Sequence, residues 1–334
     1  MALSSLIRVM ILCAMALFAG TLSPHAQKSD KLKKITVLTN YAFFGRHAPL
    51  FTGIEKGYFR EAGFDVQLLP TTGSGFVNTA IDSNKADFAL TDASVLVQSI
   101  AKGAKIQAFG VYLDISANGL ASLQPIPTPE SLVGRKIAAA LTDSSRIVVP
   151  IVYSLKNLDA SRLEWQAADP GTYFSLLLSG RVDVIAAAMD ADRPALSKAG
   201  AAQNKQVHFA AFADWGYDAF GIFLVTQAAR VAERPDEVKA FANAVRKSVQ
   251  YAIGNPDEAA RLMAQKNPTF DPDIVNAQWK ASIAAVQTDY VRKHGYGVAT
   301  LDRLQRTITL ARTALKIETE VTPDQLFAQG FIAP

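Results

Sequence analysis

The side chains best suited to bind a small polar ligand stand in loops that follow short apolar segments. The first loop, residues 40–47, comes after the β-branched run 35–39 and carries Asn40, Tyr41, Phe44 and His47. Aromatic rings beside an amide predict a wall that stacks a planar ligand. In the alternative interpretation, the phenylalanines belong to the core and His47 caps the helix that follows.

Two more loops of this kind follow in the first third of the chain. Ser74 and Gly75 open a predicted helix after a strand, where free N–H groups and the helix dipole favour a carboxylate, sulfonate or phosphate. The glycine spacing does not match the dinucleotide fingerprint, so no cofactor is predicted, and a plain capped turn is the alternative. Asp92 and Ser94 follow the buried run 88–90. Asp92 could accept from a ligand amine or amidine, or cap the next helix.

The second half of the chain offers a similar set. Ser144 and Arg146 stand at a strand-to-helix turn, where Arg146 could pair with an acidic ligand or lie on a solvated helix face. Asp190 ends a predicted strand. Trp215 and Tyr217 precede another strand and could form an opposing aromatic wall, although Trp215 could equally be a core residue.

No catalytic or metal-binding set is predicted. The chain has four histidines, and none pairs with a carboxylate at metal-ligand spacing. The Gly-x-Ser-x-Gly turn of a nucleophilic serine is missing from the sequence. The single cysteine, Cys13, lies in an N-terminal apolar segment, so neither a disulfide nor a cysteine nucleophile is expected in the rest of the chain.

Strand-like and helix-like segments alternate from residue 35 to residue 226, which predicts an α/β protein with mostly parallel sheets. A proline-rich stretch, 122–129, separates two such series. The segment 82–89 matches the segment 178–185: in each, a helix ends, a basic residue crosses the turn and an aspartate precedes an apolar strand. We therefore predict two similar lobes: residues 27–118 begin lobe 1, residues 119–220 form lobe 2, and residues 221–334 return to lobe 1 as one strand and a helical tail. In the alternative interpretation, the match reflects only a pattern that any helix, turn and strand in succession would give.

The N-terminal segment is typical of a secretion signal. Arg8 is followed by about ten apolar residues, which is too short to span a bilayer and fits a signal peptide over residues 1–26. An uncleaved anchor is the alternative. The formal net charge is +4, and the basic residues do not cluster, so nucleic-acid binding is not expected. We expect a monomer that is exported.

The chain resembles the solute-binding proteins of ABC importers, in the branch related to the thiamine-pyrimidine-synthase proteins and to binders of sulfonates, taurine and nitrate. The resemblance lies in the runs 47–51, 55–59, 62–66, 86–90 and 132–137. It implies a type II periplasmic-binding-protein fold with two lobes around a ligand cleft, a periplasmic location, and an ABC permease with its ATPase as partners. An enzyme of pyrimidine-related metabolism on the same fold is the alternative. The eukaryotic enzymes of this superfamily carry a cysteine-rich iron-binding motif, which this sequence lacks.

Overall fold

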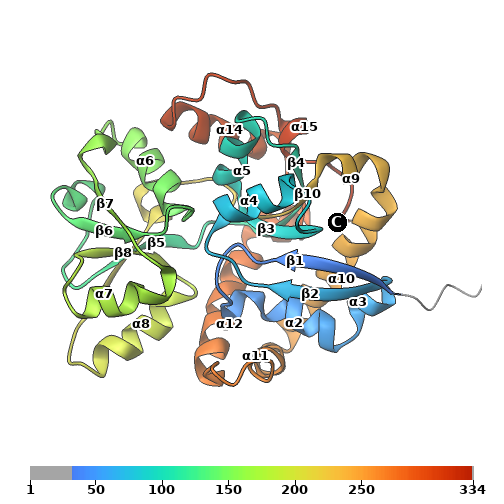
Figure 1. Cartoon of the computed structure of the whole chain (residues 1–334), viewed down its shortest axis with the longest axis horizontal. Helices are drawn as coiled ribbons and strands as arrows, with labels where there is room; N and C mark the ends of the chain where they lie inside the picture. Colours follow the sequence, from blue (N-terminus) through green and yellow to red (C-terminus); the bar gives the residue numbers. More distant parts are fainter. Residues whose placement is uncertain (1–31, 333–334) are drawn as a thin grey trace, which may run out of the picture. The chain divides into compact units, whose positions relative to one another are not determined.

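The computed structural model describes residues 32–332, so the predicted signal segment lies outside the described residues. These residues contain two five-stranded sheets flanked by helices (Figure 1). The sheet of lobe 1 has the order β2-β1-β3-β10-β4. Its strands are β1 (Lys33–Leu38), β2 (Phe64–Leu69), β3 (Phe88–Asp92), β4 (Ile106–Leu113) and β10 (Ile222–Gln227).

The sheet of lobe 2 has the order β7-β6-β8-β5-β9. Its strands are β5 (Asn118–Ser122), β6 (Lys136–Ala139), β7 (Glu164–Ala167), β8 (Val184–Ala188) and β9 (His208–Ala211). In each sheet four strands share one direction, and the fourth strand in the order, β10 or β5, is antiparallel to both of its neighbours. The predicted α/β fold is confirmed, and the mostly parallel sheets each contain this one antiparallel strand.

The predicted similarity of the two lobes is also confirmed. Asp87 accepts a hydrogen bond from Thr36 N at 2.8 Å and returns one to Thr36 O at 2.9 Å. Asp183 repeats both bonds with Lys136, at 2.8 and 3.1 Å. The aspartate thus ties the start of β3 to β1 in lobe 1 and the start of β8 to β6 in lobe 2, because its carboxylate accepts from the neighbouring backbone while its own N–H donates.

Helices cover both faces of the lobe 1 sheet (Figure 1). One face packs on α2 (Ala48–Glu55), α3 (Tyr58–Glu61), α10 (Pro235–Gly254), α11 (Pro256–Ala264) and α12 (Pro272–Val286). The other face packs on α4 (Ser74–Asp82), α5 (Ala93–Ala101), α14 (Leu301–Ala314) and α15 (Pro323–Leu326). Helix α9 (Ala228–Glu233) lies near one edge of this sheet. Lobe 2 carries α6 (Ser145–Leu155), α7 (Tyr173–Leu178) and α8 (Asp192–Ala201).

Some elements differ from the sequence expectation. The strands β5 and β7 and the helix α8 were not predicted: β5 is built of small residues, β7 is a partly exposed edge strand, and α8 has a weak apolar pattern. Within the predicted helical tail, α12 ends at Val286 and α13 (Asp289–His294) begins anew, because Thr288 Oγ1 accepts from Val291 N and so caps a new start.

The chain passes between the sheets twice, between Leu113 and Asn118 and between Ala211 and Ile222. Helix α14 is bonded to both crossings. Arg303 forms a buried ion pair with Asp114 and donates to Asp114 O at 2.9 Å. Thr307 Oγ1 accepts from Phe220 N at 3.2 Å. Because α14 also packs on α5 and α6, this side of the interface is held by apolar contacts as well.

No helix within residues 32–332 combines the length and apolar character needed to cross a membrane.

Candidate functional site

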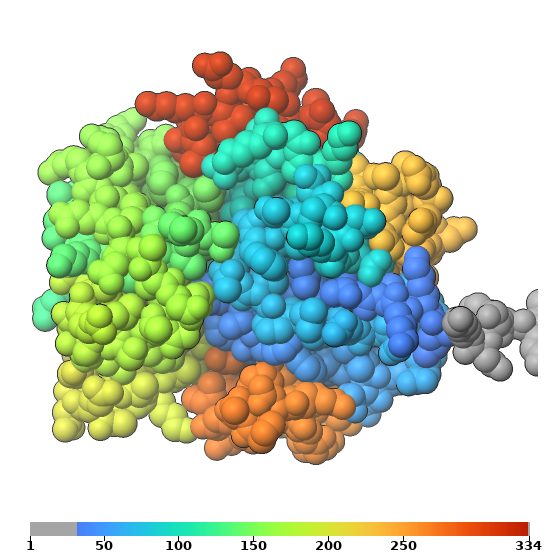
Figure 2. Space-filling view, in the orientation of Figure 1, coloured from blue at the N-terminus to red at the C-terminus, as the bar shows by residue number. Residues whose placement is uncertain are grey.

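A small cavity of about 30 Å³ lies between the two lobes. That volume accommodates roughly two water molecules. The space-filling surface of lobe 2 meets that of lobe 1 directly on the face shown (Figure 2). The lobes are therefore closed on each other. The cavity is lined by Asn40, Tyr41, Phe44, Arg46, Asn118, Asp143, Ser144, Ser145, Ala186, Ala187, Ala188 and Asp192.

The loop after β1 supplies the lobe 1 wall, and His47 organises it from behind. The His47 side chain is fully buried, and its Nδ1 accepts from Phe44 N at 3.1 Å. Its Nε2 therefore carries the proton and donates to Asn40 Oδ1 at 3.2 Å. Burial and the nearby Arg46 guanidinium lower the pKa of His47, so the ring is neutral. His47 thus positions Asn40 and does not itself face the cavity.

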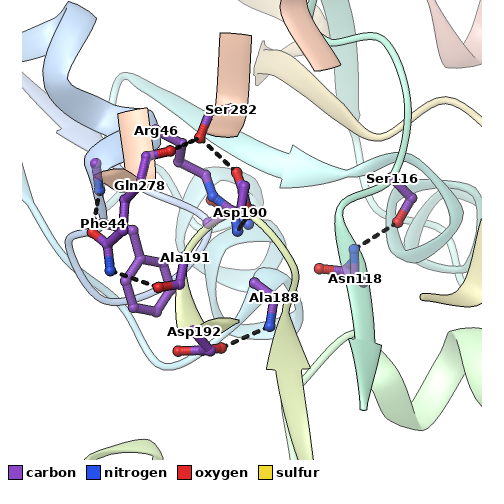
Figure 3. A network of polar contacts seen from close by, with 12 residues as sticks. Phe44, Arg46, Ser116, Asn118, Ala188, Asp190, Ala191, Asp192, Gln278 and Ser282 are labelled. Atoms are coloured by element: carbon purple, nitrogen blue, oxygen red, sulfur yellow. Dashed lines mark hydrogen bonds and ion pairs between the residues drawn. The ribbon is translucent and has the colours of Figure 1, made fainter. Parts of the chain in front are cut away.

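A buried ion pair crosses from lobe 1 to lobe 2 beside the cavity (Figure 3). Arg46, in the lobe 1 loop, is 2% exposed, and Asp190, just after β8 in lobe 2, is 4% exposed. The second carboxylate oxygen of Asp190 accepts from Ser282 Oγ of α12 at 2.7 Å. Beside this pair, Gln278 of α12 accepts from Gly45 N and donates to Ala191 O, both at 2.7 Å. Lobe 1 therefore holds the turn after β8 by three separate side chains.

Asp92 forms a second connection between the lobes. It accepts from Ser74 Oγ at 2.6 Å within lobe 1, and from Asn118 Nδ2, at the start of β5, at 2.5 Å. Asn118 also donates to Ser144 Oγ at 3.2 Å. The Asp92 side chain makes no capping bond to α5, so Asp92 does not act here as the helix cap of the alternative interpretation. Its carboxylate instead joins α4 to the cavity wall.

Two further carboxylates line the cavity from lobe 2. Asp143 accepts from Ser145 N at 2.8 Å and from the Tyr173 hydroxyl at 3.2 Å. Asp192, the first residue of α8, accepts from Ala188 N at 2.7 Å. Burial raises the pKa of Asp143 and raises that of Asp192 to about 7. Opposite them, the buried Tyr41 hydroxyl has no hydrogen-bond partner among the described residues.

The mouth of the cleft is closed by two loops in contact. Gly75 N donates to Thr142 O at 3.3 Å, and Thr142 Oγ1 donates to Thr72 O at 3.3 Å. Gly73 has φ +146°, and a Cβ there would lie 2.3 Å from Thr142 O. Glycine at this position thus allows the β2–α4 loop of lobe 1 to reach the β6–α6 loop of lobe 2.

The structure brings some of the predicted site residues together and separates others. Asn40, Tyr41, Phe44 and Ser144 line the cavity, and Asp92, Asp190, Ser74 and His47 lie one bond or contact behind that wall. Gly75 lies at the mouth of the cleft. Ser94 forms a hydrogen bond of 2.6 Å with the Tyr217 hydroxyl, and both residues lie away from the cavity.

The structure does not place Arg146, Trp215 or Tyr217 on the cavity, contrary to what the sequence had suggested. Arg146 donates to Ala139 O and Ala140 O and stacks on Trp165. Its guanidinium group is therefore bound at the end of the preceding strand, β6. Trp215 is 5% exposed and donates to Pro127 O at 3.3 Å, so it is a core residue, as the alternative interpretation had it. With Tyr217 also away from the cavity, no opposing aromatic wall forms.

Sequence reasoning did not select Arg46, Asn118, Asp143, Ser145 or Asp192 as site residues. Each is nevertheless inside or next to a segment that the pattern had singled out: the loop 40–47, the first crossing, the turn 142–146, and the end of the strand before Asp190. The sequence therefore indicated which segments form the site, but it did not indicate the direction in which each side chain points.

Comparison with known proteins places the chain in a group. A 4-amino-5-hydroxymethyl-2-methylpyrimidine phosphate synthase of Aspergillus parasiticus is 24% identical over 267 residues, which is 77% of either chain. Two solved structures share the fold. A protein of Bordetella bronchiseptica RB50 superposes with a TM-score of 0.70 at 20% identity, covering 89% of this chain and 95% of that one. The alkanesulfonate-binding protein SsuA of Xanthomonas axonopodis pv. citri, bound to MOPS, gives 0.68 at 12% identity, covering 89% and 98%.

The family model described as NMT1/THI5 like matches residues 45–259. That stretch runs from the loop with Arg46, through all of lobe 2 with Asp190 and Asp192, and into α11. On this match, the chain belongs to the NMT1/THI5-like family.

Proposed function

We propose that this protein is the solute-binding component of an ABC importer, exported to the periplasm as a monomer and serving a permease with its ATPase. The observation that carries the proposal is the polar cavity between two lobes, to which both lobes contribute side chains. A site divided in this way is complete only when the lobes meet. Ligand binding and lobe closure are therefore linked.

The size of the cavity fits a binding cycle with an open form. At about 30 Å³ the cavity is too small for a solute with more than a few atoms. A solute must therefore enter while the lobes are apart. The contacts that separate on opening are polar, namely Arg46 with Asp190, Asn118 with Asp92, and the loops at the mouth. The apolar packing of α14 on α5 and α6 remains in place.

The lobe 1 wall favours a small polar solute with a flat face. The Tyr41 and Phe44 rings stack on each other, with centroids 5.8 Å apart and planes inclined by 25°. One of these rings can slide over a planar ligand without losing its contact with the other. Asn40, held by His47, supplies an oriented amide at the edge of that surface.

An enzyme acting on pyrimidine-related molecules is the second candidate, and the synthase relatives favour it. The single cysteine of this sequence is Cys13, so the cysteine-rich iron-binding motif of the eukaryotic enzymes is missing. No group of three or more metal-ligating side chains occurs among residues 32–332. Both nitrogens of His47 are engaged, so this histidine offers no free base to a nucleophile in the cavity.

Incubation of the purified protein with a mixture of small polar metabolites, followed by mass spectrometry of the bound and free fractions, separates the two candidates. We expect one compound to be retained in a one-to-one complex and recovered unchanged. Asn118→Leu, which removes the bridge from lobe 2 to Asp92, should abolish retention. Lys198→Gln, which removes an exposed pair between the lobes, should not. Catalytic turnover of the retained compound would overturn the proposal.

A further inference from the structure

The charges around the cavity are unbalanced. Asp143 and Asp192 line it, and Asp92 and Asp190 lie directly behind its wall. Among the described residues, Arg46 is the one cationic side chain that lines the cavity. The neighbouring His47 is neutral, because burial and Arg46 lower its pKa. Four carboxyl groups thus surround a space that contains one guanidinium group.

That guanidinium group is already paired. Arg46 forms its ion pair with Asp190 and lies with its Cζ 5.6 Å from the centre of the Phe44 ring. An anionic ligand that took Arg46 would leave the Asp190 carboxylate buried without its partner, which is strongly unfavourable. The other predicted anion site, at the start of α4, is also engaged, because Gly75 N donates to Thr142 O at 3.3 Å and the Ser74 hydroxyl donates to Asp92 at 2.6 Å. An anion therefore finds no unpaired positive group here.

The carboxyl groups, in contrast, can accept further hydrogen bonds. One oxygen of Asp192 accepts from Ala188 N, and the other accepts no hydrogen bond from residues 32–332. Burial raises the pKa of both Asp192 and Asp143, and the charge of Asp143 raises that of Asp192 further. A cation placed between them would counter both effects.

Two buried donors in the same wall make no hydrogen bond of ordinary geometry within the described residues: Arg46 Nε, and the Tyr41 hydroxyl, which lies near the Tyr173 hydroxyl. Arg46 is 2% exposed, so water does not reach it freely in the closed form. Burial raises the pKa of Tyr41, which keeps its hydroxyl protonated and able to donate. Buried donors are nearly always satisfied in native proteins. An acceptor atom of a ligand would satisfy both.

We infer that the solute is a small cation, with a protonated amine or amidine-type group that contacts Asp192 and Asp143 and an acceptor atom that faces Tyr41 and Arg46. This inference rests on the proposed binding function and names the chemical class of its ligand. The same carboxyl groups disfavour sulfonates, carboxylates and nitrate.

Calorimetry with pairs of probes that match in shape and differ in charge tests the inference. Suitable pairs of small planar probes are acetamidine with acetate, and guanidine with nitrate, each titrated into the purified protein. We expect binding of the cationic member of at least one pair and of neither anion. Asp192→Asn keeps the shape of the side chain and should weaken that binding by about tenfold or more. Asp143→Asn should act in the same direction.

Glu164→Gln is the matched control, because Glu164 is an exposed carboxylate of the same lobe, at the start of β7. It should leave the affinity unchanged. Binding of either anion, no binding of any cationic probe, or equal affinity in Asp192→Asn and the parent would each overturn the cationic assignment. The proposed binding function fails in a different way, by turnover of a retained compound.

Discussion

Asp190→Asn should open the two lobes rather than unfold the protein. The substitution keeps the size of the side chain but removes the charge that faces Arg46. Both side chains are at most 4% exposed, so in the closed form the guanidinium group would remain buried without a counter-charge. Breaking one side of such a pair typically costs about 3–5 kcal/mol. Arg46 avoids this cost if the lobes separate and water reaches it.

The expected magnitude follows from that comparison. A penalty of about 3–5 kcal/mol on the closed form alone changes the ratio of closed to open molecules by roughly 10² to 4 × 10³. The melting temperature should fall less than that penalty implies, because the open form is folded and escapes it. Lys198→Gln removes the exposed pair with Asp271, where side chains are 64% and 42% exposed, and should change the ratio by a few-fold at most.

Spin-label distances measure the ratio directly. Leu141 and Phe76 are 77% and 49% exposed on either side of the mouth, so cysteines at these two positions report opening without disturbing the core. Asp190→Asn without ligand should show a longer distance population than the parent, and Lys198→Gln should not. If Asp190→Asn gave the parent distribution, the buried pair would not be what keeps the lobes closed, and the argument from burial would be refuted.

Three other outcomes are expected. In the closed form Asp192 has a pKa of about 7, above its ordinary value of 3.8. The protonated side chain therefore stabilises the closed form below about pH 4. This contribution, up to about 4 kcal/mol, is lost as the pH rises to 7. Spin-label distances without ligand should therefore show that the closed fraction falls from about pH 4 to pH 7. A flat pH profile in the parent, or the parent's profile in Asp192→Asn, would contradict this. Gly73→Ala should hinder closure and weaken ligand binding in calorimetry, whereas Gly103→Ala, which shares the positive φ but has no neighbour within 4 Å, should bind as the parent does. Arg303→Met leaves its carboxylate partner buried and should lower the melting temperature by at least about 6 °C in scanning calorimetry, and equal shifts for the exposed Arg306→Met would contradict that reasoning.

The fold was predictable where the signal was local. The turn that ends at Asp87 and its equivalent at Asp183 use the same residue types in the same order, because each must end a helix, cross a turn and tie two strands together. Strand β5, with the sequence Asn-Gly-Leu-Ala-Ser, has almost no β-branched or aromatic residue. It forms a strand because β8 and β9 lie on either side of it, and both neighbours are distant in the sequence.

The site was predictable in position but not in detail. Strand ends identified the loops, as the rule for open α/β sheets requires. The pairing of Arg46 with Asp190 depends on how one lobe meets the other across 144 positions of sequence, and no local pattern encodes that. Trp215 shows the opposite error: its position before a strand suggested a ligand wall, yet its indole N–H finds a carbonyl at Pro127 inside its own lobe.

The bonds from α14 to both crossings have a consequence for the order in which the molecule assembles. Lobe 2 lies between the two crossings, and its strands and helices are complete by residue 211. Arg303 and Thr307, which fix those crossings, are made about ninety residues later, so a growing chain holds a finished lobe 2 on two tethers that are not yet anchored. The two crossings can therefore be anchored only after residues 303 and 307 have been made, and a chain cut short before residue 303 would have two lobes without these anchors.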